Sequence, residues 1–123
     1  MLKVDSGSAV PVYEQLKRQI KLGIVSGRYP AEYRLPSIRE LASKLTVNPN
    51  TIAKAYRQLE TDGFLVSRAG SGFFVVHSTE KLKETRMELL KEITEEYAAK
   101  AVELGASPDL IMNAVRNRLE GKF

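Results

Sequence analysis

Hydrophobic residues recur at helical spacing in two short stretches near the middle of the chain. The first stretch follows Ser37, a residue type that caps helix N-termini, and Glu40 comes three residues later, where a capping box needs it. The apolar positions then fall on one helical face: Ile38, Leu41, Ala42 and Leu45. The pattern therefore predicts a short amphipathic helix that ends near Leu45.

The second stretch predicts a longer helix directly after a turn. Asn48 is a good N-cap, and Pro49 falls at the first helical position, where a missing N–H has no cost. Gly63 ends the helix, because glycine tolerates a positive φ. The buried stripe consists of Ile52, Ala55, Tyr56 and Leu59. Thr46 and Val47 leave room only for a turn, so the two helices are predicted to form a helix-turn-helix.

The segment before this pair predicts one more helix. Residues 1–10 are expected to be a flexible start, and Pro11 then opens a helix that runs to about Ser26. Its apolar stripe consists of Val12, Leu16, Ile20 and Ile24. Gly23 lies inside this helix, where glycine costs about 1 kcal/mol relative to alanine. We therefore expect close packing against a neighbour at Gly23.

After Gly63 the pattern changes from helical to extended. Residues 64–68 and 73–76 are β-favouring runs on either side of a glycine-rich turn, which predicts a hairpin. Arg34 and Leu35 are expected to form a short strand before the first helix of the pair. A helix-turn-helix that is followed by such a hairpin is a winged helix.

The last third of the chain returns to helical periodicity. A long helix is predicted from Thr79 to about Leu104, and a second one from Ser107 to about Leu119. A pair of helices joined by a short link cannot bury both of its apolar stripes, so we expect it to form a dimer with a second copy. The alternative is a helical appendage on a monomer. The predicted dimerisation residues are Leu82, Leu89, Leu90, Ile93, Tyr97, Ala101, Leu104, Leu110, Ile111, Ala114, Val115 and Leu119.

These elements define a fold class and a division into domains. The class is α+β, mainly α, with an N-terminal winged helix-turn-helix over residues 1–78 and a C-terminal helical hairpin over residues 79–123. A length of 123 residues suits one small domain with such an appendage. No apolar run approaches a membrane span, and the N-terminus lacks the apolar core of a signal peptide, so a cytoplasmic location is expected.

Charge is distributed unevenly between the two predicted domains. Residues 1–78 hold 11 basic and 6 acidic side chains, a net charge of +5, whereas residues 79–123 hold 8 and 9, a net charge of −1. A basic surplus on the winged helix indicates a polyanionic partner. Many small domains carry a similar surplus without such a partner, so the charge supports this interpretation without deciding it.

Two surfaces of the predicted winged helix suit contact with DNA. The second helix of the pair leaves polar or small residues outside its stripe: Asn50, Thr51, Ala53, Lys54, Arg57 and Gln58. Such a face can enter the major groove, with residues near the helix start at base edges. The hairpin tip around Arg68 carries small residues and no acid, which suits approach to a phosphate backbone or the minor groove. The alternatives are an ordinary solvated helix face and a plain hairpin.

A family resemblance strengthens this interpretation. The stretch LPSIRELASKLTVNPNTIAKAYRQLETDGFLVSRAGSGFFV closely resembles the winged helix of the GntR family of bacterial transcriptional regulators. With the preceding PVYEQLKRQIKLGIVSGRY, the likeness covers roughly residues 9–77. The short two-helix tail resembles that of the YtrA-type subfamily, whose members lack a large effector-binding domain.

The resemblance implies several contact residues, and the sequence departs from the family pattern at three positions. Arg39 matches an arginine that contacts phosphate or bases, and Gly70 matches the wing tip. Pro49 replaces a frequent contacting arginine, Glu32 replaces a usual glycine, and Ala53 replaces an often basic residue. The full set of residues predicted to bind DNA is Arg34, Ser37, Arg39, Asn48, Asn50, Thr51, Lys54, Arg57, Arg68, Gly70 and Ser71.

The function that these features predict is a dimeric, sequence-specific repressor on an inverted-repeat operator in double-stranded DNA. The resemblance further implies control of transporter genes and of its own gene. A winged helix that binds proteins, or that binds DNA without specificity, is the alternative. Catalysis is not expected, because the chain has no cysteine, one isolated histidine (His77) and no phosphate-cradling loop.

No cofactor, metal or membrane contact is predicted. A small-molecule effector would have to bind between the tail helices and the winged helix, or across a dimer, because little chain remains to build a separate pocket. Tyr97, Met87 and Met112 would line such a place unless they are core or interface residues.

Overall fold

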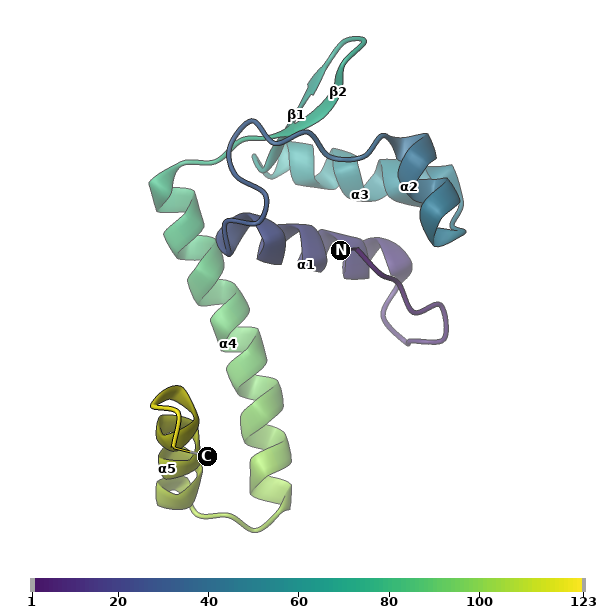
Figure 1. The fold of residues 1–123 in the computed structure, drawn as a ribbon. Coiled ribbons are helices and arrows are strands. Elements are labelled where there is room, and N and C mark those ends of the chain that lie inside the picture. Colours follow the sequence, from purple (N-terminus) through teal and green to yellow (C-terminus); the bar gives the residue numbers. More distant parts are fainter. Residues whose placement is uncertain (1, 123) are drawn as a thin grey trace. The chain divides into compact units, whose positions relative to one another are not determined.

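The computed structural model describes residues 2–122. Helices and strands follow the order that the sequence pattern predicts, and the mainly α class with a winged helix-turn-helix and a helical tail is confirmed (Figure 1). The elements are α1 (Val12–Val25), α2 (Ile38–Leu45), α3 (Pro49–Thr61), β1 (Leu65–Arg68), β2 (Gly72–Val75), α4 (Thr79–Glu103) and α5 (Pro108–Leu119). The chain divides into two compact units, up to Arg86 and from Met87 onward, so the division falls inside α4.

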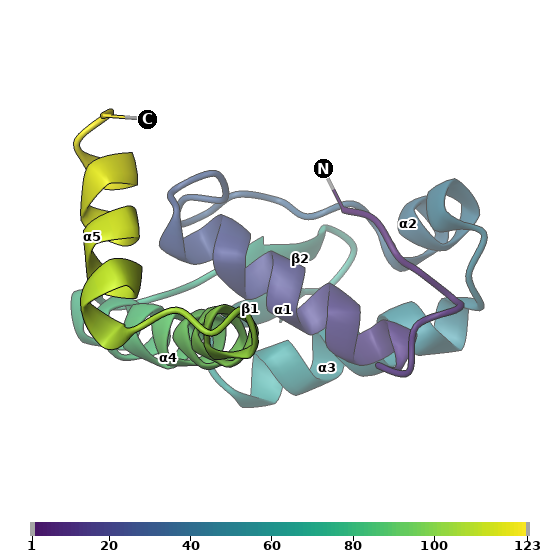
Figure 2. The ribbon, with the colours of Figure 1, turned by 90° about the horizontal axis from the view of Figure 1, so that it is seen from below.

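One hydrophobic core holds the first unit together. Helix α1 runs alongside α3, and α2 packs where α3 begins (Figure 2). The fully buried side chains come from the three helices, from β2 and from the segment before α2: Leu16, Ile20, Ile24, Leu35, Leu41, Ile52, Tyr56, Leu59 and Val75. The stripes predicted for α1 and α3 thus face each other, which fixes α3 by its inner face and leaves its outer face exposed.

Both predicted caps of the helix pair are confirmed. The Ser37 hydroxyl accepts a hydrogen bond from the Glu40 backbone N–H at 3.1 Å, and the Glu40 carboxylate accepts one from the Ser37 N–H at 3.3 Å. The Asn48 side-chain oxygen accepts from the Asn50 N–H at 2.8 Å. Between the helices Thr46 adopts a left-handed conformation with φ of 55°. These local bonds define where α2 and α3 begin and so set the angle of the turn.

The close packing expected at Gly23 is also confirmed. A Cβ atom placed on Gly23 would lie 2.3 Å from two ring carbons of Tyr29, well inside van der Waals contact. The Tyr29 N–H also donates to the Gly23 carbonyl at 2.9 Å. The chain after α1 therefore folds back against the helix, and only glycine leaves room for the tyrosine ring.

The N-terminal segment is tied to α1 by side-chain amides. The Lys3 N–H donates to the Gln19 side-chain oxygen at 2.9 Å, and the Asp5 N–H donates to that of Gln15 at 2.8 Å. The Gln15 amide also donates to the Asp5 carbonyl, and Leu2 is buried in the core. The expectation of a flexible start did not anticipate these bonds, because glutamines on a helix face give no periodic pattern.

The wing is wider than its two strands. Strands β1 and β2 pair antiparallel, and the segment before α2 flanks β2 on its other side. The Glu32 N–H donates to the Val75 carbonyl at 2.9 Å, and the Leu35 N–H donates to the Phe73 carbonyl at 3.0 Å. The short strand predicted at Arg34 appears as a single β-bridge from Arg34 to Phe74. The segment 32–35 thus forms a third row of the wing.

Candidate nucleic-acid interface

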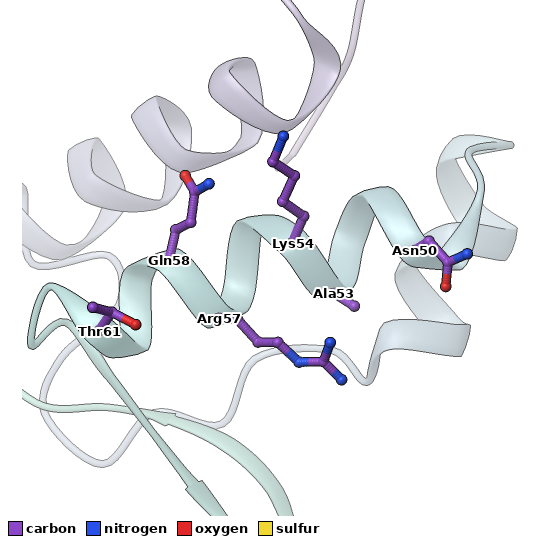
Figure 3. A pocket seen from close by; sticks show the side chains of 6 residues that line it. All are labelled: Asn50, Ala53, Lys54, Arg57, Gln58 and Thr61. Carbon is purple, nitrogen blue, oxygen red and sulfur yellow. The ribbon is translucent and has the colours of Figure 1, made fainter.

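The outer face of α3 forms a shallow depression without a carboxylate. Its volume is about 370 Å³, and its lining residues are Asn50, Ala53, Lys54, Arg57, Gln58 and Thr61 (Figure 3). Asn50 and Arg57 are exposed, and Figure 3 shows Arg57 directed away from α1. Ala53 was expected to face solvent, but it is 8% exposed and forms the floor of the depression. Its methyl group leaves space that a longer side chain would fill.

Two of these residues are held by α1. The Lys54 ammonium lies 3.8 Å from the ring centroid of Tyr13, a cation–π contact. The Gln58 side-chain oxygen accepts a hydrogen bond from Lys17 at 2.8 Å. Both side chains point toward α1 in Figure 3. Lys54 must therefore leave the tyrosine ring before it can extend away from α1.

The start of α2 and the turn place three further predicted residues. Arg39 is exposed on α2, whereas the side chains of Ser37 and Asn48 accept backbone hydrogen bonds as helix caps. The bonds from Ser37 hold the pKa of the Glu40 carboxyl below its ordinary value of 4.5. Glu40 is therefore a carboxylate at neutral pH, beside the predicted contact residues Ser37 and Arg39.

The wing brings two arginines together on one small sheet. The Arg34 Nε donates to the Ser71 carbonyl at 2.8 Å and lies 3.4 Å from where a Cβ of Gly72 would stand. Gly72 also has φ of 109°, a conformation that side chains disfavour. Arg68 donates to the Glu32 carboxylate at 2.8 Å, and its guanidinium lies 4.4 Å from the centroid of the Phe74 ring. Arg34 thus donates to a neutral carbonyl, whereas Arg68 donates to a carboxylate.

A carboxylate also joins the wing to α3. The Glu60 side chain accepts hydrogen bonds from the Ser67 N–H at 3.0 Å and from its hydroxyl at 2.7 Å. These bonds lower the pKa of the Glu60 carboxyl below 4.5. Because Glu60 lies near the end of α3 and Ser67 lies in β1, the pair fixes the wing relative to the outer face of α3.

Sequence reasoning missed several residues that shape this surface. Tyr13 and Lys17 restrain side chains of α3, and Glu60 orients the wing. A weak indication existed, since Tyr13 and Lys17 are four residues apart and share a face of α1. Nothing in the spacing indicates which residue of another helix they contact. Thr51, predicted at a base edge, is half-buried and does not line the depression.

The second unit keeps much of its apolar surface exposed. Leu90, Ile93 and Tyr97 follow one face of α4 and are 53%, 45% and 43% exposed. The other exposed members of the predicted dimerisation set are Leu104, Leu110, Val115 and Leu119. Leu89 and Ala101 are buried, and Leu82 packs against the core of the first unit instead of remaining free.

Within residues 2–122 the structure contains no cluster of three or more side chains that could hold a metal ion. In the same range no helix combines the length and the hydropathy that crossing a bilayer requires.

Known proteins resemble the winged helix, and some of them resemble most of the chain. The profile of the bacterial regulatory proteins of the gntR family matches residues 12–75. The HTH-type transcriptional repressor YtrA of Bacillus subtilis is 37% identical over 93 residues, which are 75% of this chain and 72% of the relative. A GntR family transcriptional regulator from Listeria monocytogenes superimposes with a TM-score of 0.77 at 32% identity, covering 93% of this chain and 98% of that one.

A second similar structure is a complex with operator DNA. The DNA-binding domain of AraR in complex with operator ORX1 has a TM-score of 0.54 and is 32% identical, with 61% of this chain and 93% of that chain covered. The winged helix of this chain is thus similar in structure to a DNA-binding domain that is bound to its operator.

Proposed function

This chain belongs to the GntR family of bacterial regulatory proteins, and from that premise we propose that it is a sequence-specific DNA-binding regulator of transcription. The family is one of regulators and not of enzymes. The observation that carries the proposal is the outer face of α3, where exposed Asn50 and Arg57 line a depression whose lining includes no carboxylate. Amide and guanidinium groups are the side chains that read adenine and guanine edges or bind phosphate.

The proposed arrangement puts α3 in the major groove. Asn50, near the N-terminus of α3, reaches base edges, and Arg57 and Arg39 bind phosphates. The wing lies against the backbone or the adjacent minor groove, with Arg34 as its available cation. Phosphate contacts then fix the register, and the start of α3 supplies the sequence preference.

The assembly that we propose is a homodimer on an inverted repeat. The exposed stripe of Leu90, Ile93 and Tyr97 supports self-association, and a second copy would bring a second α3 to a second half-site. The repressor YtrA, to which the chain is similar, supports repression as the outcome. Bacterial chromosomal DNA lies in the cytoplasm, so the protein would act there. Control of transporter genes and of its own gene, and response to a small-molecule effector, remain predictions.

The test measures binding to the DNA upstream of its own gene by fluorescence anisotropy at several salt concentrations. A shuffled duplex of equal length is the control. We expect tight binding to the native duplex, two chains per site and a steep loss of affinity with salt. Equal binding to both duplexes would contradict sequence-specific recognition at this site. Failure to bind either duplex would favour a winged helix that binds a protein.

A further inference from the structure

Glu32 occupies a backbone conformation that disfavours any side chain. Its φ is 73°, in the left-handed region, where glycine is free and a Cβ atom is crowded. Two hydrogen bonds join the backbone of this segment to one edge of β2, from the Glu32 N–H to the Val75 carbonyl and from the Val75 N–H to the Tyr33 carbonyl, both at 2.9 Å. The wing therefore fixes the backbone of Glu32 in this conformation. A residue with a side chain is less stable at this position than glycine would be.

The Glu32 side chain places its carboxylate next to Arg68 of the wing. The Glu32 carboxylate accepts from Arg68 at 2.8 Å, while the guanidinium of Arg68 also lies over the Phe74 ring. The three residues come from three adjacent rows of the wing: the flanking segment, β1 and β2. Arg68 is therefore already bound to an anion when the protein is free.

The ion pair is open to exchange. The side chains of Arg68 and Glu32 are 44% and 69% exposed, so solvent, salt or another anion can reach both groups. Exposed pairs of this kind are weak, so a DNA phosphate can displace the carboxylate. Arg34 on the same wing differs, because the group that accepts the hydrogen bond from its Nε is the neutral Ser71 carbonyl.

We propose that Glu32 is an internal counter-ion that competes with DNA phosphate for Arg68 and so lowers the affinity of the wing for DNA of any sequence. The inference rests on the proposed DNA-binding function and deepens it. Binding must separate Arg68 from Glu32 and leaves the carboxylate close to the phosphates, which opposes association. The opposing effect does not depend on base sequence, so Glu32 sets the strength of binding and leaves the sequence preference unchanged.

The test compares the full chain with Glu32→Gln, Arg68→Ala and the double variant. Glutamine keeps the size of the side chain and an oxygen that accepts from Arg68, but it removes the charge. Glu84→Gln on α4, also exposed, is the matched control for net charge. Binding to the native and shuffled duplexes is measured by anisotropy across a salt series.

We expect Glu32→Gln to tighten binding to both duplexes by about two- to fivefold per chain, with the ratio between duplexes unchanged. The slope of log affinity against log salt should be steeper in Glu32→Gln, because in the wild-type chain salt also weakens the Glu32–Arg68 pair that opposes binding. In the Arg68→Ala background the same substitution should have little effect, because the arginine that the Glu32 carboxylate binds is then absent.

Three results would overturn the inference. Weaker binding by Glu32→Gln would mean that the carboxylate orients Arg68 for DNA. An equal gain in the Arg68→Ala background, or in Glu84→Gln, would mean a general effect of net charge. Glu32→Gly, which removes both carboxylate and backbone strain, gives a second measurement if the glutamine variant unfolds.

Failure of the proposed function gives a different pattern. If the wild-type chain binds the native and shuffled duplexes equally, sequence-specific regulation fails, while the coupling between Glu32 and Arg68 is still measured on both duplexes. If no variant binds any duplex, the inference and the proposed function are both overturned.

Discussion

The ammonium group of Lys54, on the outer face of α3, lies 3.8 Å from the ring centroid of Tyr13 on α1. Arg57, one turn further along α3, points away from α1 (Figure 3). A cation that rests on an aromatic ring must give up that contact, worth about 0.5–1 kcal/mol at an exposed site, before it binds a phosphate elsewhere. The two basic residues of α3 are therefore not equivalent.

We expect Arg57→Ala to weaken DNA binding more than Lys54→Ala does. Arg57 should account for about tenfold in affinity as a charge-assisted contact, and Lys54 for about threefold or less, because part of its interaction energy is already realised with Tyr13. Anisotropy titrations on the native duplex measure both variants. Tyr13→Leu is the control: without the ring, truncation of Lys54 should become more harmful. Equal losses for the two alanine variants would contradict the difference.

Asn50 should affect specificity rather than general affinity. Its side chain is exposed at the start of α3, where a helix in the major groove meets base edges. Asn50→Ala should lose about 1–3 kcal/mol on the native duplex and almost nothing on the shuffled one. Thr61→Ala, at the other end of the same depression, is the matched truncation and should change neither. Parallel losses on both duplexes would assign Asn50 to the phosphate backbone.

Gly23→Ala should destabilise the first unit. The new methyl group would meet the Tyr29 ring at 2.3 Å, and the ring is buried and cannot move freely. Overpacking of this kind costs about 1–3 kcal/mol, which urea unfolding can measure. The double variant with Tyr29→Ala should be less destabilised than the sum of the two single variants, because the clash is then absent. Strict additivity would show that the ring is not the cause.

The features that sequence predicted correctly are local ones. The caps at Ser37 and Asn48 and the hairpin after Gly63 depend on residues a few positions apart, whose chemistry permits one geometry. The helical stripes predicted which faces are buried, because burial follows the period of the helix. The part of the site that follows directly from these elements, the outer face of α3, was therefore accessible from the sequence.

Contacts between distant residues were not predictable in the same way. Lys17 meets Gln58 across 41 positions, and Glu32 meets Arg68 across 36. A charged or amide residue on a solvent-facing row has many possible partners, and periodicity does not choose among them. These long-range pairs determine which side chains of the predicted surface already have a partner within the free protein. The sequence therefore predicted the surface but not the contacts that its side chains make.

Acid should weaken the attachment of the wing to α3. The hydrogen bonds from Ser67 keep the pKa of the Glu60 carboxyl below 4.5 in the folded chain, so the unfolded chain binds more protons in this range. The stabilisation is therefore complete above about pH 4.5 and is lost as the pH falls through the folded pKa. Glu60→Gln should flatten the pH dependence of the unfolding temperature at acidic pH.

A second variant separates the two hydrogen bonds to Glu60. Ser67→Ala removes the hydroxyl donor and keeps the backbone N–H donor, so it should reproduce only part of the effect. Both variants are followed by circular dichroism on heating at a series of acidic pH values. An unchanged profile in Glu60→Gln would show that the carboxylate does not contribute to the acid sensitivity.

Ile93→Asp should dissociate the proposed dimer. Ile93 lies between Leu90 and Tyr97 on an exposed apolar face of α4, and a second copy would bury all three. A carboxylate in the centre of such a contact would be desolvated without a partner, which costs several kcal/mol and shifts the dimer to monomer. Sedimentation measures the mass, and anisotropy should show weaker binding to a duplex with two half-sites. Binding to a single half-site should be unchanged, because the winged helix is intact.

The control for this prediction lies on the same helix. Ala99 is exposed on the opposite side of α4 from Leu90, Ile93 and Tyr97, so Ala99→Glu adds a charge without placing it in the contact. It should sediment like the wild-type chain and bind the two-site duplex with the same affinity. If Ala99→Glu dissociates the protein while Ile93→Asp does not, the chains associate through the other side of α4. A wild-type chain that sediments as a monomer on and off DNA would mean that the apolar face of the tail has a different role.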